Sequence, residues 1–310
     1  MNESGRGSRR LLTVPATRLA AGRDGVLTRA DLHGFGLTRW DLRREVAAGR
    51  WRLHGNHCIL THTGPLDRRA RWRIALHEVQ AHAALDGVTA LHAAGLEHYA
   101  EDTIHVSIPR GARPRSWPGV HVHETRRRRD SDVLYQGIRR AHPAVAAVRG
   151  ALWARSDRQA ALILVMTAQQ RLASGTDLAH ALAPIKRDRR RRLLTAVVGD
   201  VVDGAQSLGE LDFADLCRRY GIPPPSRQVI RTGPLGRAFL DAYWDDCDVV
   251  VEIEGIHHGD GLTQVEDALR QNTLSAGGAA WLRIPVLGLR IAPGAFMAQV
   301  AAARSRRHGS

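Results

Sequence analysis

Two stretches near the start of the chain have the apolar spacing of short helices. The first follows Thr28 and the second follows Thr38, and each threonine has an aspartate three residues later, which predicts a capped helix start. G-F-G between them predicts a turn, and Gly49 marks the end of the second helix. R-W-R-L-H-G-N-H-C-I-L then predicts two short strands around a glycine turn.

Helix, tight turn, helix and hairpin is the order of a winged helix-turn-helix, which we predict for residues 12–64. On the second helix Leu42 belongs to an apolar face, whereas Arg39, Arg43 and Arg44 project elsewhere. A recognition helix needs an apolar back for the core and arginines for phosphates and guanine edges. We therefore expect these arginines to bind DNA. The other interpretation is a solvated, arginine-rich helix on a protein-interaction module.

Residues 65–205 have mainly helical periodicity with one β patch. T-I-H-V-S-I-P and G-V-H-V-H-E-T alternate with period two and predict paired strands. The arginine-rich runs 126–129 and 186–192 are expected to be solvated faces or contacts to a phosphate backbone. No histidine here has the spacing of an H-E-x-x-H motif, so we expect surface or half-buried residues rather than ligands and no chemistry. These histidines are His77, His82, His92, His105, His121 and His123.

Residues 206–308 alternate helix and strand in the order αβββαβα, which predicts a small mixed sheet flanked by helices. The fold class is therefore a multidomain α+β protein. D-V-V-V-E-I-E has the continuous apolar run of a central strand, and Glu252 and Glu254 share one face near its end. The preceding strand contributes Asp241, and the leading helix contributes Glu210.

Carboxylates that converge in this way repel one another and resist ionising together. A hard divalent cation, Mg²⁺ or Mn²⁺, prefers oxygen ligands and offsets the crowded charge. The alternative is an exposed strand end with solvated acids. His257 and His258 directly after the strand, in addition to Asp241 one strand earlier, favour a site.

Six motifs of residues 206–308 occur in a fixed order. They are the helix with Glu210, P-S-R-Q at 225–228, R-A-F-L-D-A-Y-W at 237–244, V-E-I-E-G-I-H-H at 251–258, R-Q-N at 270–272 and G-A-A-W-L-R-I-P at 278–285. Together they resemble the very-short-patch-repair endonuclease-like branch of the PD-(D/E)XK nuclease superfamily. The whole chain is also similar to actinobacterial proteins with an AbiEi-type antitoxin N-terminal domain, a resemblance that implies DNA binding and repression of the protein's own operon.

The nuclease resemblance implies that Asp241 is the central metal ligand and Glu252 the second. Glu254 stands where the superfamily motif has a lysine, and Lys186, the only lysine of the chain, is far away in sequence. The branch often lacks this lysine, so the residue that activates water stays open.

Three further residues receive roles from the same resemblance. His257 or His258 would act as a general base or donate a hydrogen bond to the scissile phosphate. The equal alternative is that these histidines contact Glu254 and hold its side chain in place. Arg270 would stabilise the charge of the transition state.

Composition changes this picture in three respects. The net charge of +14 favours a polyanionic partner such as DNA, although GC-rich coding also produces a chain with one lysine among 45 basic residues. No apolar run is long enough for a membrane span, and the first twelve residues are expected to be a short disordered tail rather than a signal peptide. Three widely spaced cysteines favour a reducing, cytoplasmic location without disulfides.

Two functions follow from these patterns. The first is a DNA-binding protein whose C-terminal domain is an endonuclease that uses Mg²⁺ or Mn²⁺ to hydrolyse phosphodiester bonds. The alternative is an AbiEi-type antitoxin and transcriptional regulator whose nuclease fold is catalytically silent. DNA is the expected partner in both cases, with a cognate toxin or a second copy of the chain as a further one.

Overall fold

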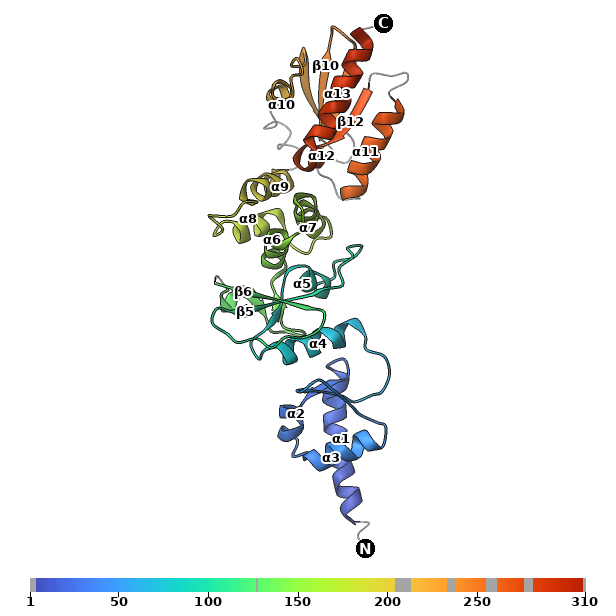
Figure 1. Ribbon diagram of the computed structural model, residues 1–310, viewed down its shortest axis with the longest axis vertical. Coiled ribbons are helices and arrows are strands. Elements are labelled where there is room, and N and C mark those ends of the chain that lie inside the picture. The colour runs from blue at the N-terminus through green and yellow to red at the C-terminus, as the bar shows by residue number, and fades with distance from the viewer. Residues whose placement is uncertain are drawn as a thin grey trace. The chain divides into compact units, whose positions relative to one another are not determined.

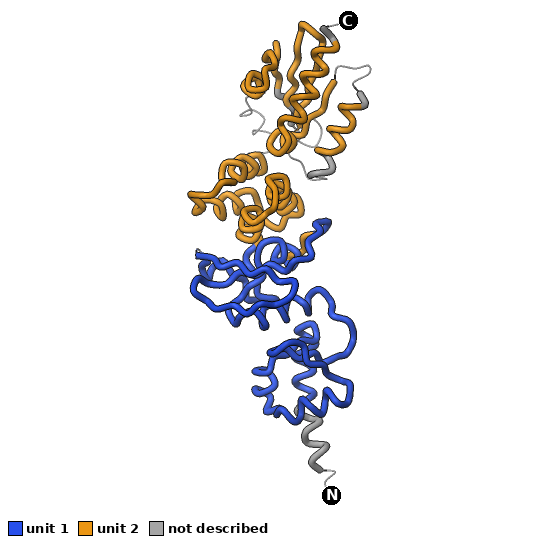
Figure 2. Tube along the Cα trace, in the orientation of Figure 1, with its two compact units in different colours: residues 1–93, 97–142 blue, residues 94–96, 143–310 orange. Residues whose placement is uncertain are grey.

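The computed structural model is an α+β protein with three sheets in the part of the chain that it describes (Figure 1). Residue contacts divide the chain into two compact units (Figure 2), which we call unit 1 (residues 1–93 and 97–142) and unit 2 (residues 94–96 and 143–310). The described residues are 4–126, 128–203, 213–232, 238–254, 261–275 and 281–308.

Unit 1 begins with three helices and a three-stranded antiparallel sheet of order β1-β3-β2. The two predicted helices, the turn and the hairpin are confirmed. The predicted disordered tail is wrong, because a helix starts at Ser4, and Ala16 and Ala20 on it are buried in the core. The elements are α1 (Ser4–Ala21), β1 (Val26–Thr28), α2 (Arg29–Gly34), α3 (Arg39–Ala47), β2 (Arg52–His54) and β3 (Cys58–Leu60).

Both predicted helix caps form. The Thr38 side chain accepts a hydrogen bond from the backbone N–H of Asp41 at 3.3 Å, and the Asp41 carboxylate accepts one from the N–H of Thr38 at 2.9 Å. Thr28 and Asp31 make the same reciprocal pair at the start of α2. Gly49 follows α3 with a φ of +67°, the left-handed conformation that ends a helix.

The rest of unit 1 is a five-stranded sheet of order β6-β5-β4-β8-β7 with two helices. The predicted strand pair is confirmed as β5 and β6, which run parallel. β4, β7 and β8 were not predicted, because strands of two residues carry no periodicity. The elements are α4 (Arg68–Val79), β4 (Ala84–Leu85), α5 (Gly87–Ala93), β5 (Ile104–Pro109), β6 (Val120–Thr125), the 3₁₀ turn η1 (Asp130–Asp132), β7 (Val133–Leu134) and β8 (Arg140–Ala141).

Glu78 on α4 fixes the β2–β3 hairpin. Its carboxylate is 2% exposed and accepts hydrogen bonds from the backbone N–H groups of Asn56, His57 and Cys58 at 3.1, 2.7 and 2.9 Å. Burial raises the pKa of Glu78, but these donors outweigh it and lower the pKa below its usual value. Gly55 in the turn has a φ of +72°, and a Cβ there would lie 2.6 Å from Glu78 Cδ, so the turn requires glycine.

Unit 2 begins with four helices, which agrees with the mainly helical periodicity of this region. They are α6 (Pro143–Trp153), α7 (Asp157–Gln169), α8 (Gly175–Leu182) and α9 (Arg191–Asp203). Asp200 on α9 is 2% exposed and accepts two hydrogen bonds from Arg290, from Nε and from Nη2, each at 2.9 Å. Arg290 lies on α12 (Val286–Ile291), so this double contact connects the four helices to the C-terminal part of the same unit.

The C-terminal part has a four-stranded sheet of order β12-β11-β10-β9. β9, β10 and β11 are antiparallel, and β12 runs parallel to β11. The predicted order of helix, three strands, helix, strand and helix is observed, with α12 as a short addition, and β11 is a central strand as predicted. The remaining elements are α10 (Phe213–Arg219), β9 (Arg227–Thr232), β10 (Ala238–Trp244), β11 (Val249–Glu254), α11 (Gly261–Ser275), β12 (Trp281–Pro285) and α13 (Pro293–His308).

Candidate functional site

Asp241 on β10 and Glu252 on β11 lie directly opposite each other in the antiparallel register. Their side chains therefore share one face of the sheet, with Cβ atoms about 4.5–5.5 Å apart. The other face of β11 holds three fully buried apolar residues, Val249, Val251 and Ile253. The period of two that buries these residues brings the two acids together, and we call them the carboxylate pair.

Glu252 is 7% exposed. Its Oε2 atom is buried and accepts no hydrogen bond from the residues that the structure describes. Buried carboxylate oxygens normally have a partner, and an exception points to a water molecule or an ion. Within the described part of the chain, no three carboxylates come within 4.8 Å of one another, so the acids that the sequence brought together meet there as a pair rather than as a larger group.

Arg283 on β12 is the cation next to these acids. The parallel register places it beside Glu252, and its Nε lies 3.7 Å from Glu252 Oε2 and 3.2 Å from Glu254 Oε1. Glu254 therefore faces a guanidinium. Arg283 was not predicted as a site residue, although it is the one polar residue between the buried Leu282 and Ile284.

Asn272 on α11 holds the backbone of Arg283 in place. Its Nδ2 donates to the Arg283 carbonyl at 2.9 Å, and its Oδ1 accepts from the Arg283 N–H at 3.0 Å. Asn272 is only 4% exposed, so this double contact ties helix α11 to strand β12. The R-Q-N motif thus acts on the sheet through its asparagine.

Of the other residues predicted for this site, the structure describes only Arg270. Arg270 is exposed on α11 and forms an ion pair with Asp267 one turn earlier. Glu210, His257 and His258 lie outside the described residues. Their predicted roles therefore stay predictions.

The N-terminal arginines surround an exposed tryptophan. The guanidinium carbons of Arg39 and Arg43 each lie 5.0 Å from the ring centroid of Trp40, which is 58% exposed. Arg44 instead pairs with Asp41 at 3.1 Å and with Glu45 at 3.7 Å, which offsets its charge. We call Arg39, Trp40 and Arg43 the α3 basic surface.

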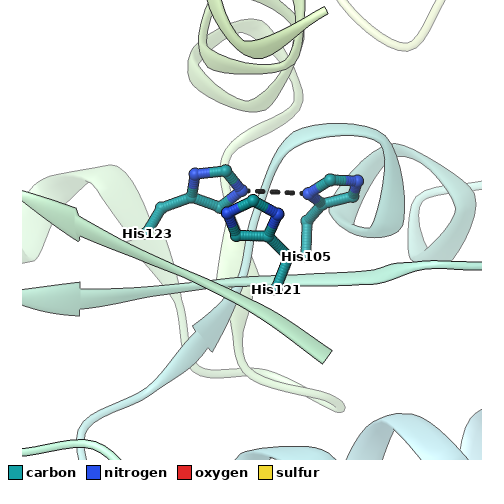
Figure 3. Close-up of side chains that lie close together, drawn as sticks. All are labelled: His105, His121 and His123. Carbon is teal, nitrogen blue, oxygen red and sulfur yellow. Dashed lines mark hydrogen bonds between the residues drawn. The ribbon is translucent and has the colours of Figure 1, made fainter. Parts of the chain in front are cut away.

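Three histidines of the middle region come together, although we expected no metal-binding set there (Figure 3). His105 on β5 is in register with His121 on β6, and His123 is two residues further along the same face. His105 Nδ1 and His123 Nε2 lie 2.9 Å apart. The three nearest ring nitrogens all lie within 4.8 Å of one another. We call these residues the histidine cluster.

Burial lowers the pKa of His123 to about 3, with further lowering from His105 and His121. The imidazole of His123 is therefore neutral at physiological pH. H-V-H at 121–123 was the only sequence signal of the cluster, and the partner on β5 follows from a register that no periodicity reveals.

No family model matches the chain, and no curated protein matches it. Among the helices of the described residues, none is both long and apolar enough to span a bilayer. The three cysteines are buried, and none of them forms a disulfide. Function must therefore be inferred from the side chains and their geometry.

Proposed function

We propose that this protein binds DNA and that its C-terminal domain is a metal-dependent endonuclease of the PD-(D/E)XK type. The observation that carries the proposal is the carboxylate pair, Asp241 and Glu252, on adjacent strands of a small mixed sheet. The element order around this sheet, with a helix before it and a helix between β11 and β12, supports the same assignment. The substrate would be a phosphodiester bond of DNA.

Asp241 and Glu252 fit a hard divalent cation. Both are oxygen ligands on one face, and the buried Glu252 Oε2 accepts no hydrogen bond from the described residues. These two residues would hold Mg²⁺ or Mn²⁺, which when bound polarises a phosphate oxygen and lowers the pKa of a water molecule. Arg283 would bind the phosphate and supply the positive charge that the missing lysine provides elsewhere.

The N-terminal part would deliver this activity to DNA. Its order of helices and its hairpin support a winged helix-turn-helix in which α3 is the recognition helix. Arg39 and Arg43 would contact phosphates or guanine edges, and Trp40 would add an exposed apolar surface. Arg44 is the weakest of the predicted contacts because two acids already pair with it.

The test is cleavage of plasmid DNA with Mg²⁺ or Mn²⁺ by the wild type, Asp241→Asn and Glu252→Gln. We expect cleavage by the wild type and a loss of about 100-fold or more in both variants, because each removes a ligand that stabilises the transition state. Asp245→Asn is the matched control. Asp245 directly follows the last residue of β10, is exposed and forms an ion pair with Arg227. Equal rates in all chains, or no cleavage with either ion, would refute the nuclease.

A second function is favoured by the position of Arg283. Its guanidinium lies beside both Glu252 and Glu254 and offsets their charge without a metal ion. This arrangement supports a regulator of the AbiEi antitoxin kind whose nuclease fold is silent. It predicts specific promoter binding without cleavage under any metal.

Promoter binding would be measured at several salt concentrations for Arg39→Ala and Arg43→Ala. We expect each variant to bind more weakly and to reduce the slope of log affinity against log salt by about one, as for a lost phosphate contact. Arg44→Ala is the control and should have a smaller effect. If neither of the first two variants weakens binding, α3 does not contact the DNA.

A further inference from the structure

We propose that His105, His121 and His123 bind a zinc ion on the β5–β6 face of unit 1. This site is separate from the carboxylate pair, and the proposed nuclease does not use it. All three side chains come from two neighbouring parallel strands and lie together on one face (Figure 3). Each offers one ring nitrogen, and the three nitrogens lie within 4.8 Å of one another.

The spacing of the nitrogens suits a tetrahedral ion after small side-chain rotations. Two ligands of a tetrahedral zinc ion with Zn–N bonds of about 2.0–2.1 Å are about 3.3 Å apart. His105 Nδ1 and His123 Nε2 are 2.9 Å apart, so they need to separate by a few tenths of an ångström. The His121 and His123 rings are stacked at an interplanar angle of 3°, and they must tilt to aim at one point. The χ2 torsion of histidine is soft, which makes this tilt inexpensive.

Glu101 lies close enough to His105 to provide the carboxylate partner that zinc-binding histidines usually have. His105 turns Nδ1 toward the cluster and Nε2 toward Glu101, whose Oε2 lies 4.0 Å away. A carboxylate behind a histidine fixes its tautomer and raises its basicity as a ligand. A rotation that brought Glu101 into hydrogen-bond distance would direct the N–H of His105 Nε2 toward Glu101 and the lone pair of Nδ1 toward the ion.

The hydroxyl of Ser107, next to the histidine cluster, is a second observation that points to a bound species at this site. Ser107 is in register with His123 and lies two residues after His105, so it shares the face of the cluster. Its hydroxyl is buried and makes no hydrogen bond with the residues that the structure describes. Such an atom beside three imidazoles is explained by a water molecule or an ion at the site.

The access path and the type of ligand also favour a metal. His121 is exposed, so an ion can enter from solvent. Imidazole ligands select zinc, copper and nickel over magnesium and calcium. Three histidines leave the fourth position of the ion open for water or a small anion, as in catalytic zinc sites.

The test is calorimetric titration of the metal-free full chain with ZnCl₂. We expect one zinc ion per chain, a loss of affinity of at least about 100-fold for His121→Asn, and a loss of about 10- to 100-fold for Glu101→Gln. His98→Asn is the matched control, because His98 is 88% exposed and asparagine tolerates its φ of +57°. We expect this control to bind zinc like the wild type.

A second measurement does not depend on the folding of a variant. Co²⁺ added to the wild type in place of zinc should give the strong visible bands of a tetrahedral ion with nitrogen ligands, and zinc should abolish them. The proposal is overturned if the wild type shows neither zinc binding nor these bands. It is also overturned if His121→Asn, folded by circular dichroism, binds zinc as tightly as the wild type.

Discussion

At the scale of single residues, the described sites depend on acids whose partners come from other elements. Glu78 is held by three backbone N–H groups of a hairpin about 20 positions earlier in the chain, and Glu252 faces Asp241 and Arg283 from the strands on either side. In each case the acid is buried by the packing of its own helix or strand. What it contacts is decided by the register of the neighbour.

The contacts of Glu78 make stability depend on pH. Its pKa is lower in the folded chain than in the unfolded chain, where it is about 4.3. The ionised carboxylate therefore stabilises the fold above that value, and this stabilisation is lost as the pH falls through the folded pKa. We expect Glu78→Gln to lower the free energy of unfolding by about 2–3 kcal/mol at neutral pH, because a neutral amide accepts these bonds less well.

Urea unfolding of the wild type and of Glu78→Gln at a series of pH values measures this effect. The difference should shrink as the pH falls below the unfolded value of about 4.3 and then through the lower pKa of the folded carboxyl. Glu97→Gln is the control, since its side chain is 78% exposed, and it should leave stability nearly unchanged. A difference that stays constant down to low pH would show that the charge of Glu78 is not the cause.

The sequence indicated Asp241 and Glu252 but not Arg283 or the histidine cluster. Glu252 and Glu254 follow a clear apolar run, so their place at the end of a central strand could be read from period two. Arg283 and His105 lie in short strands, and their significance comes from which residue stands beside them. Register between strands depends on packing of both faces, and one strand alone does not encode it.

At the scale of elements, the helices with sequence-encoded ends were the ones predicted well. Thr28 and Thr38 start α2 and α3 as expected, because each has an aspartate three residues later that completes the cap. α1 was missed because its first residues have neither a cap nor a long apolar stripe, and its buried positions, Ala16 and Ala20, are small.

The cap of α3 should be measurable. Thr38→Ala removes the side-chain acceptor for the Asp41 N–H, and we expect it to lower the free energy of unfolding by about 1 kcal/mol. Thr38→Ser keeps the hydroxyl and should retain most of the stability. Thermal melting followed by circular dichroism compares the three chains, and equal melting temperatures would mean that the cap contributes nothing. If α3 reads DNA, Thr38→Ala should also weaken DNA binding.

At the scale of the whole molecule, the helices α6–α9 and the C-terminal sheet belong to one compact unit. A double hydrogen bond between Asp200 and Arg290 is one of their connections, and these bonds raise the pKa of Arg290. Asp200 is the buried member of this pair. Removal of Asp200 therefore takes away two hydrogen bonds and the negative charge beside the partly exposed Arg290.

We expect Asp200→Asn to lower the free energy of unfolding by about 2–3 kcal/mol, less than for a fully buried pair, because the Arg290 side chain is 29% exposed. The control is Asp215→Asn in the same unit, where Asp215 pairs with Arg218 on the exposed face of α10 and the loss should stay below about 1 kcal/mol. Denaturant unfolding of both variants measures the two values. Similar losses in the two variants would show that the Asp200–Arg290 contact carries no special weight.

The position of β6 at the edge of the five-stranded sheet has a consequence for its dynamics. An edge strand is bonded on one side only, so its amide protons should exchange with solvent sooner than those of β5. An ion bound by one histidine of β5 and two of β6 would cross-link the two strands, because separating β6 from β5 would release the ion. At a free concentration 100 times its dissociation constant, the ion would add about 2.7 kcal/mol to the cost of opening. Slower exchange of the β6 amide protons in the presence of zinc would then measure how fully the histidine cluster is occupied by the ion.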